Sequence, residues 1–400
     1  MSSTKKNILI IGGTGAQGLP VIHGLLSPST STSNGSTSPY TVTVLTRDPA
    51  SARAQSLLST FPNSLTLLKG SFTSESDVRL ALSGCWGAFV NIDGFATGEA
   101  LEIFYTMRCY ELALEAGTVR LYVHGNLDYG YKNSGWDPEM RCGHYDGKGR
   151  AGRWILDRNK ELLSSQRGTT MRAALFTTGP YIEMSIASST PMTPRVELER
   201  DSSSGGGDPA LTWYLPLGRD GAVPHVALDD CAHYVRWLFD NPDRADGMDL
   251  AVAIGHIRYD EMAEAFTKVT GKKARFVDVN LDTYFNGSPY WKAVGSRPCG
   301  YTAGSADPPP GFMTVRENFR GFWNLWRASG GNRGPVKRDY ELLDEIHPAR
   351  IRTAEEYFRR EDEKARKDGR GSLWDAVVAA KPVLKIHEDK ELRARADGKL

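Results

Sequence analysis

Cysteine is scarce in this chain, with five among 400 residues. The five are scattered, their number is odd, and no two form a Cys-x-x-Cys pair. This excludes a disulfide framework and is typical of reduced thiols in a cytosolic or nuclear protein. Two Cys-x-His pairs occur, Cys142-Gly-His144 and Cys231-Ala-His233, but their spacing matches no common zinc pattern, so we expect no metal.

Long hydrophobic runs and an excess of one charge are also lacking. The apolar run at 7–11 turns at once into glycines, so it is too short and wrongly flanked for a signal peptide. No later run is long enough to span a bilayer, so we expect no membrane segment. The formal net charge is +1, which gives no reason to expect nucleic acid as a partner. We therefore expect a cytoplasmic protein, with the nucleus as a second location.

Apolar segments of strand length alternate with helix-like segments in the first part of the chain. The expected strands are 7–11, 40–46, 65–69, 87–92, 120–124 and 170–176, and the expected helices are 15–26, 49–60, 75–83, 98–116 and one to about 165. Strands separated by helices of this length form parallel β-α-β units. The sequence therefore predicts the α/β class, with a doubly wound parallel sheet of the Rossmann type.

Composition divides the chain into three expected parts. Residues 1–180 form the Rossmann domain, with a flexible insertion at 27–39, where Ser, Thr, Gly and Pro cannot bury a face. Residues 181–350 form a smaller α/β lobe on the substrate side that is interleaved with the sheet. Residues 351–400 form a charged helical extension, because nearly balanced acidic and basic residues favour a solvated helix with ion pairs.

A glycine-rich turn joins the first expected strand to the first expected helix. Its residues are Gly12, Gly13, Thr14, Gly15, Ala16, Gln17 and Gly18. Glycine permits the tight turn and lets a pyrophosphate approach backbone N–H groups at the start of a helix. Strand, turn, helix and second strand follow in the expected order, so this segment predicts a dinucleotide site.

The tip of the second strand bears on the choice of dinucleotide. An acid at this position holds the ribose 2′-OH of NAD, whereas a guanidinium suits a 2′-phosphate. This chain presents Arg47 first and Asp48 one residue later. We therefore expect NADP(H) rather than NAD(H), with Asp48 as the contrary signal. Asn91, at the end of the fourth strand, is expected to bond the ribose or to cap the next helix.

The segment from His144 to Ile155 reads HYDGKGRAGRWI and places Tyr145 and Lys148 on one helical face. Its glycines are expected to let the chain pass close beneath the cofactor before the helix carrying Arg153 begins. Upstream, His124 ends the fifth strand and is expected to be a packed core residue rather than a catalyst.

These motifs, in this order, resemble the NmrA-like family, atypical relatives of the short-chain dehydrogenase/reductases. The resemblance rests on four motifs: GGTGAQG, the Thr46-Arg47 tip, HYDGKG and GPYIE at 179–183. Similarity to the fungal branch rests on four later segments, DDCAHYVRWLFDNPDRADG, KVTGKKARFVDV, ENFRGFWNLW and YELLDEIHP. It implies an NADP-binding Rossmann domain with a smaller α/β lobe. The cofactor positions that it implies are Gly12 to Gln17, Arg47 to Ser51, Asn91, Ile92 and Asp93, Lys148, and Tyr181, Ile182, Glu183 and Met184.

The family position Lys148 is the strongest catalytic candidate, since near the nicotinamide ribose it would bind hydroxyls and act as a proton donor. Tyr145 is a weaker candidate, because relatives often carry Phe there. Relatives commonly have Ser after the fifth strand, where this chain reads His124-Gly-Asn126-Leu-Asp-Tyr129. Asn126 could supply a carboxamide N–H and Tyr129 a hydroxyl, or the site could lack a donor and not turn over.

Two functions follow from the resemblance. The preferred one is an NADP(H)-dependent oxidoreductase that reduces a C=O, C=N or C=C bond of a fungal specialised metabolite. The alternative is a non-catalytic NADP(H)-sensing regulator that binds a transcription factor or another protein. Aromatic residues crowd the C-terminal half, and those from Tyr284 to Trp291 could wall a pocket for an apolar or aromatic small molecule.

Overall fold

A computed structural model describes residues 5–28, 37–165, 169–198, 208–287, 289–299 and 313–384. Most of the insertion expected at 27–39 lies outside the described residues, as do residues 385–400 of the expected C-terminal extension.

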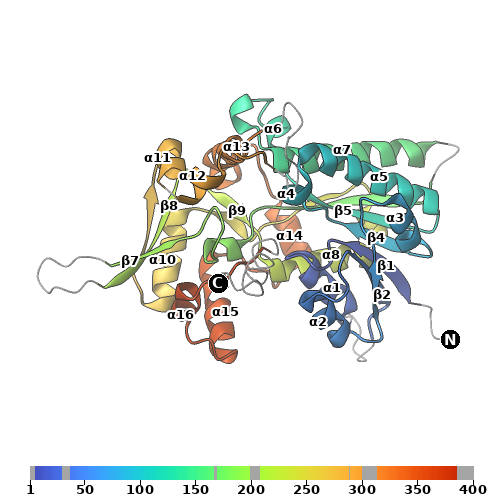
Figure 1. Ribbon diagram of the computed structural model, residues 1–400, viewed down its shortest axis with the longest axis horizontal. Helices are drawn as coiled ribbons and strands as arrows, with labels where there is room; N and C mark the ends of the chain where they lie inside the picture. Colours follow the sequence, from blue (N-terminus) through green and yellow to red (C-terminus); the bar gives the residue numbers. More distant parts are fainter. Residues whose placement is uncertain are drawn as a thin grey trace, which may run out of the picture.

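The larger part of the molecule is built on one parallel sheet (Figure 1). Its strands are β1 (Lys6–Ile11), β2 (Tyr40–Thr46), β3 (Leu65–Lys69), β4 (Gly87–Val90), β5 (Leu121–Leu127), β6 (Arg172–Thr178) and β10 (Asp249–Ala251). They lie in the order β10-β6-β5-β4-β1-β2-β3, and every neighbouring pair is parallel. The chain moves outward from β1 in one direction and then returns to β4 on its other side. The β1/β4 boundary is therefore the topological switch point, where such sheets bind ligands.

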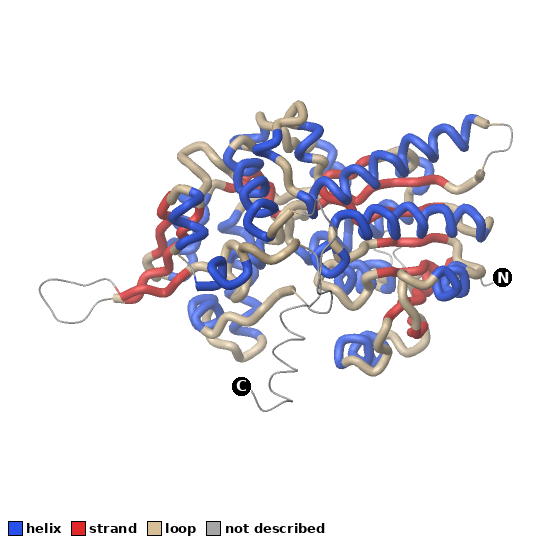
Figure 2. The backbone as a smooth tube through the Cα atoms, turned by 45° about the horizontal axis from the view of Figure 1, so that its top comes forward, coloured by secondary structure: helices blue, strands red, loops and turns tan. Residues whose placement is uncertain are grey.

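Helices cover both faces of this sheet, as Figures 1 and 2 show. The helices of this part are α1 (Gly18–Leu26), α2 (Ala52–Thr60), α3 (Glu75–Leu82), α4 (Gly94–Thr97), α5 (Glu99–Ala116), α6 (Gly130–Asn133), α7 (Gly143–Ser164), α8 (Leu228–Asp240), α9 (Pro242–Ala245) and α14 (Tyr340–Ile346). One face packs against α3, α5 and α7 and the other against α1, α8 and α14, each through its own hydrophobic cluster. Burial on both faces explains why these strands read as nearly continuous apolar runs.

The smaller lobe has a mixed sheet and several helices. Its strands are β7 (Arg195–Leu198), β8 (Pro209–Leu215), β9 (Val223–His225), β11 (Gly255–Ile257) and β12 (Ala274–Asp278), and its helices are α10 (Tyr259–Thr270), α11 (Leu281–Asn286), α12 (Pro289–Val294), α13 (Val315–Arg327), α15 (Ala354–Lys367) and α16 (Leu373–Val378). Trp213, Phe266, Trp323 and Phe358 are fully buried in its core. Short 3₁₀ turns complete the fold at Pro138–Met140, Ile182–Ser185 and Gly330–Asn332.

The predicted fold class is confirmed: the sheet is parallel and doubly wound, with a smaller α/β lobe and C-terminal helices. The two parts exchange segments, since α8 packs on α1 and β10 pairs with β6 although both come after residue 181. The helix α15 carries ion pairs on its outer side, but Tyr357 and Phe358 are buried against the lobe. The helix α15 is therefore amphipathic and packs against the lobe.

The glycines of HYDGKGRAGRWI differ from expectation. They lie inside α7, which already begins at Gly143. A Cβ on Gly149 would lie 2.6 Å from the Tyr129 Cα, and one on Gly152 would lie 2.8 Å from the Asn126 Oδ1. These glycines therefore let α7 pack closely against the end of β5, a tertiary contact that the spacing alone did not reveal.

Candidate functional site

A single cavity of about 980 Å³ follows the carboxyl edge of the sheet across the β1/β4 switch point. One end lies beside the glycine turn and the tip of β2, and the other end lies among side chains of α13. Beside Lys148 the cavity continues into a section that Phe95, Phe319 and Phe322 line. The structure thus places two neighbouring compartments in one space.

The glycine turn fits a pyrophosphate. Gly12 has a φ of +88°, and a Cβ there would lie 2.4 Å from the Asn91 carbonyl oxygen, so only glycine fits between β1 and β4. The backbone N–H groups of Ala16 and Gln17, just before α1, donate to no acceptor among the described residues. Unpaired N–H groups at a helix start attract phosphate oxygens, so this cradle suits the dinucleotide that the sequence predicts.

Two arginines lie at the β2 end of the cavity. Arg47 is exposed at the strand tip, and Arg53, in the first turn of α2, donates through Nη1 to the Thr14 carbonyl oxygen at 3.2 Å. Ser51 is the N-cap residue of α2 and also lines this end. Asp48 Oδ1 accepts from the Ala50 backbone N–H at 3.0 Å, so its carboxylate is used in a local turn. Sequence reasoning missed Arg53, whose signal was a second arginine in the helix that follows the strand tip.

Lys148 lies at the centre of the cavity in a polar network. Its ammonium pairs with Glu102 of α5 at 2.8 Å and donates to the Ile92 carbonyl oxygen at 2.7 Å and to Asn91 Oδ1 at 3.0 Å. The Asn91 amide in turn donates to Gln17 Oε1 at 2.6 Å. This chain of contacts ties the lysine to the glycine turn.

Glu102 is fully buried, and sequence reasoning did not find it. Burial raises its pKa to about 6, while the attraction of Lys148 acts in the opposite direction. Nothing in the sequence marks this glutamate among the other acidic residues of α5, because only the packing of α5 on α7 brings it to the lysine. The pair fixes the ammonium at the switch point.

Asn126 lines the cavity, but its hydrogen bonds differ from the expected donor role. Thr177 donates its hydroxyl proton to Asp249, so its oxygen accepts from the Asn126 amide at 2.8 Å. The Asn126 Oδ1 points toward Gly152 and has no hydrogen-bond partner among the described residues. Asn126 therefore joins β5, β6 and α7.

Tyr145 is buried at the wall of the cavity, with its ring 5.4 Å from that of Trp326 and 6.0 Å from that of Phe322. Burial raises the pKa of its phenol well above the ordinary value, so the hydroxyl keeps its proton near neutral pH. His124, by contrast, is fully buried and lies outside the cavity lining, and burial lowers its pKa to about 3. It is a neutral core residue, as expected.

The segment after β6 contributes unevenly to the cavity. Tyr181 and Met184 line it, as do Ile92 and Asp93 after β4. Ile182 is instead fully buried in the core of the smaller lobe. Glu183 also lies outside the lining and accepts from the Leu228 backbone N–H at 3.0 Å, at the first residue of α8. Of this predicted run, only the first and fourth side chains face the cavity, because residues three apart lie on the same side of a 3₁₀ turn.

Aromatic residues wall the far end, but they are not the ones expected. Phe319 and Phe322 of α13 line the cavity together with Phe95 of α4. Tyr284 and Trp291, from the run that was expected to form the wall, lie behind it, with the Trp291 ring 5.1 Å from that of Phe319. The sequence shows that this lobe is rich in aromatic residues. Which of them face the cavity depends on the packing of α11 and α12 behind α13.

The described residues contain no group of three or more His, Cys, Asp or Glu side chains arranged to hold a metal ion. In the same ranges, no helix combines the length and the apolar character that crossing a membrane requires.

The fold defines a Rossmann-type α/β protein with a cavity at the sheet's switch point. The chain belongs to the NmrA-like family, whose model matches residues 4–290. It is 26% identical to the NmrA-like family domain-containing oxidoreductase ptmS of Penicillium ochrochloron, over 73% of this chain and 79% of that protein. It is also 26% identical to oxidoreductase malD of Malbranchea aurantiaca, over 70% of this chain and 80% of the relative.

Solved structures share the fold at lower identity. NmrA, described as a negative transcriptional regulator in complex with NAD, superimposes with a TM-score of 0.60 at 16% identity, covering 91% of this chain and 98% of that one. The NADPH-dependent quinone oxidoreductase QOR2 of Escherichia coli, complexed with NADPH, gives a TM-score of 0.58 at 17% identity, covering 88% and 98%. The same architecture therefore serves both a regulator and a reductase.

Proposed function

We propose that this protein is an NADP(H)-dependent oxidoreductase that reduces a C=O, C=N or C=C bond of an apolar or aromatic specialised metabolite. One observation carries the proposal: a single cavity joins the glycine turn to an aromatic compartment, with Lys148 and Tyr145 between them. Hydride transfer needs a cofactor and an acceptor side by side with a proton donor within reach. The names of the curated relatives, which are oxidoreductases, support the same class.

The residues present fit a dinucleotide with a 2′-phosphate. The cradle at Gly12 to Gln17 offers backbone N–H groups to the pyrophosphate, and Arg47 and Arg53 offer guanidinium groups to the 2′-phosphate. Asp48, which could have favoured NAD, is turned toward the Ala50 N–H. NADPH, when bound, supplies the hydride.

Each remaining side chain has a role that follows from its position. Lys148 presents a positive charge at the switch point and orients ribose hydroxyls, held in place by Glu102 and Asn91. Tyr145 keeps its phenolic proton because burial raises its pKa, and its neutral hydroxyl can donate a hydrogen bond to the substrate atom that gains negative charge. Phe319 and Phe322 exclude water from the compartment that holds the substrate.

The test is consumption of NADPH, followed by its absorbance, with a panel of polycyclic ketones, quinones, cyclic imines and enones. At least one of them is expected to oxidise NADPH. Lys148→Met alone would leave Glu102 buried and unpaired, so the informative variant is Lys148→Met with Glu102→Gln, compared with Glu102→Gln alone. We expect the double variant to lose about 100-fold or more in turnover relative to Glu102→Gln, because the ribose is no longer held in the reacting orientation, while NADP⁺ affinity changes little. Unchanged turnover would reject the role of the lysine, and no NADPH loss with any compound would reject the enzyme.

A second function, an NADP(H)-sensing regulator, is favoured by two observations. The Lys148 ammonium is already surrounded by Glu102, Ile92 and Asn91, as in a structural cation. Leu101 and Phe104, three residues apart on α5, are 42% and 56% exposed, an apolar surface that a partner protein could cover. This function predicts dinucleotide binding without hydride loss, so the same absorbance assay separates the two.

A further inference from the structure

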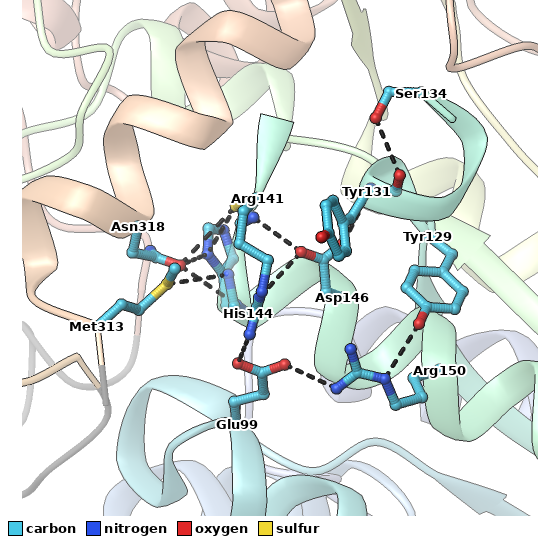
Figure 3. Close-up of polar contacts among 12 residues, drawn as sticks. Glu99, Tyr129, Tyr131, Ser134, Arg141, His144, Asp146, Arg150, Met313 and Asn318 are labelled. Carbon is cyan, nitrogen blue, oxygen red and sulfur yellow. Dashed lines mark hydrogen bonds and ion pairs between the residues drawn. The ribbon is translucent and has the colours of Figure 1, made fainter. Parts of the chain in front are cut away.

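His144 is a buried polar side chain of the cavity that the mechanism above does not use. It is the second residue of α7, lines the cavity and is 8% exposed. Figure 3 shows its ring beside Asn318 of α13. A ligand that covers this ring without forming a hydrogen bond to it leaves a buried polar atom unpaired, which costs binding free energy. The ring therefore restricts which ligands the compartment binds well.

The contacts with Asn318 determine which ring nitrogen carries the proton. The His144 backbone N–H, which can only donate, lies 3.3 Å from the Asn318 Oδ1, so the carbonyl oxygen of this side chain faces the histidine. The His144 Nδ1 lies 3.0 Å from the same oxygen and must therefore be protonated to bond it. The Cys142 Sγ lies 3.3 Å from Nδ1, and its thiol hydrogen is directed to the Asn318 Oδ1 at 3.8 Å, so Nδ1 keeps its own proton. Burial lowers the pKa of the ring to about 4, so it is neutral near pH 7. In a neutral ring with a proton on Nδ1, Nε2 is a hydrogen-bond acceptor.

The residues around the His144 ring indicate which kind of molecule the compartment can bind. The Nε2 has no hydrogen-bond partner among the residues that the structure describes. The rings of Phe95, Tyr145, Phe319 and Phe322 lie 4.7, 4.9, 5.7 and 5.9 Å from the His144 ring. Aromatic side chains at these distances form flat walls that favour another flat ring. Within this apolar wall, His144 contributes an acceptor on its free nitrogen.

We propose that His144 selects the substrate: the compartment takes a flat aromatic molecule that carries an N–H or O–H, and Nε2 accepts that hydrogen bond. This inference rests on the proposed function for the existence of a substrate and deepens it by naming the substrate's chemistry. Asn318 is a positioning residue, because it acts through the tautomer of His144.

The first test reads the tautomer directly and needs no substrate. A long-range ¹H–¹⁵N correlation spectrum of ¹⁵N-labelled protein saturated with NADP⁺ distinguishes protonated from unprotonated ring nitrogens, and the spectrum of His144→Gln assigns the signals. We expect a protonated Nδ1 and an unprotonated Nε2 near neutral pH. A proton on Nε2 would overturn the proposal.

The second test measures binding of matched probes to the NADP⁺-saturated protein by calorimetry. Indole is compared with 1-methylindole, and 2-naphthol with 2-methoxynaphthalene, so that each pair differs in the donor. We expect the donor of each pair to bind about three- to tenfold more tightly, which is the effect of one hydrogen bond. Equal affinities within both pairs, or no binding by any of the four, would overturn the proposal.

Variants separate the acceptor from the shape of the wall. His144→Phe keeps an aromatic ring and should abolish the preference for the donor within each pair. The matched control Phe319→Leu should weaken both members of a pair alike and keep their ratio. If His144→Phe does not fold, the wild-type ratios and the spectrum still decide the matter. Neither test depends on turnover, so the two failures are distinguishable: failure of the NADPH assay alone would reject the enzyme and leave His144 selecting a bound ligand, whereas failure of these tests alone would reject the role of His144 and leave the enzyme.

Discussion

Removal of the two arginines at the β2 end should convert the protein from preferring NADP⁺ to treating NADP⁺ and NAD⁺ alike. Arg47→Met removes an exposed guanidinium that has no role in the glycine turn. A hydrogen bond between charged groups contributes about 1.5–3 kcal/mol, with the lower end appropriate for an exposed side chain. We therefore expect NADP⁺ to bind Arg47→Met about tenfold more weakly, since 1.4 kcal/mol is a factor of ten. NAD⁺ affinity should stay within about twofold, because its 2′-OH carries no charge.

Arg53→Met also tests whether a guanidinium binds the 2′-phosphate, but this side chain has a second role in the glycine turn. Arg53 also bonds the Thr14 carbonyl oxygen, so its loss should loosen the turn and weaken both dinucleotides by a common factor. The ratio of the two affinities, measured by calorimetry, removes that common factor. The ratio should fall further in the double variant, and less steeply at high salt, which screens exposed charges.

Two results would refute the reasoning. If Arg47→Met weakened NAD⁺ and NADP⁺ equally, the arginine would hold the adenosine part rather than the 2′-phosphate. If Asp48→Asn weakened NAD⁺ more than tenfold, the carboxylate would bind the ribose instead of the Ala50 N–H, and the structural reason for preferring NADP(H) would be wrong.

Three further predictions concern stability. Burial raises the pKa of Glu183 from 4.5 to about 8, so between these pH values the unfolded chain has lost this proton and the folded protein has kept it. The free energy of unfolding should therefore fall by about 1.4 kcal/mol per pH unit as the pH rises through this range, and urea unfolding of Glu183→Gln should lack this loss. A Cβ at Gly18 would lie 2.2 Å from the Gly12 carbonyl oxygen. Gly18→Ala should therefore lower the free energy of unfolding by about 1–3 kcal/mol, measured by thermal unfolding, and weaken NADP⁺ binding. Unaltered binding would show that the turn can shift without loss of the dinucleotide site. Arg338 pairs with Asp128 at 2.7 and 2.8 Å where both are buried, so Arg338→Met should cost about 3–5 kcal/mol in urea unfolding, and adding Asp128→Asn should restore part of it.

The sequence predicted the sheet well and the site unevenly. Strand–helix alternation is a local signal, and β2 and β3 fall at the residues expected from it. The glycine turn, Arg47 and Lys148 were also found from local patterns, and they line the cavity except for Gly13. Gly13 instead packs against Ile10, Ile22 and Val44, so it serves the contact between helix and sheet. Ile182 and Glu183 do not, because the face that each residue of a short 3₁₀ turn presents depends on what packs against it.

The sequence by itself determined the class of the fold, the glycine turn and the identity of the family. These depend on hydrophobic period, on glycine where a φ is positive, and on motifs that are contiguous in the chain. The tertiary structure alone decided that Glu102 pairs with Lys148, that Asn126 bonds Thr177, that Phe319 rather than Tyr284 faces the cavity, and that the Asn318 Oδ1 lies 3.0 Å from the His144 Nδ1. Each of these is a contact between residues distant in sequence. Such a contact depends on how closely two elements pack, which no single segment of the chain encodes.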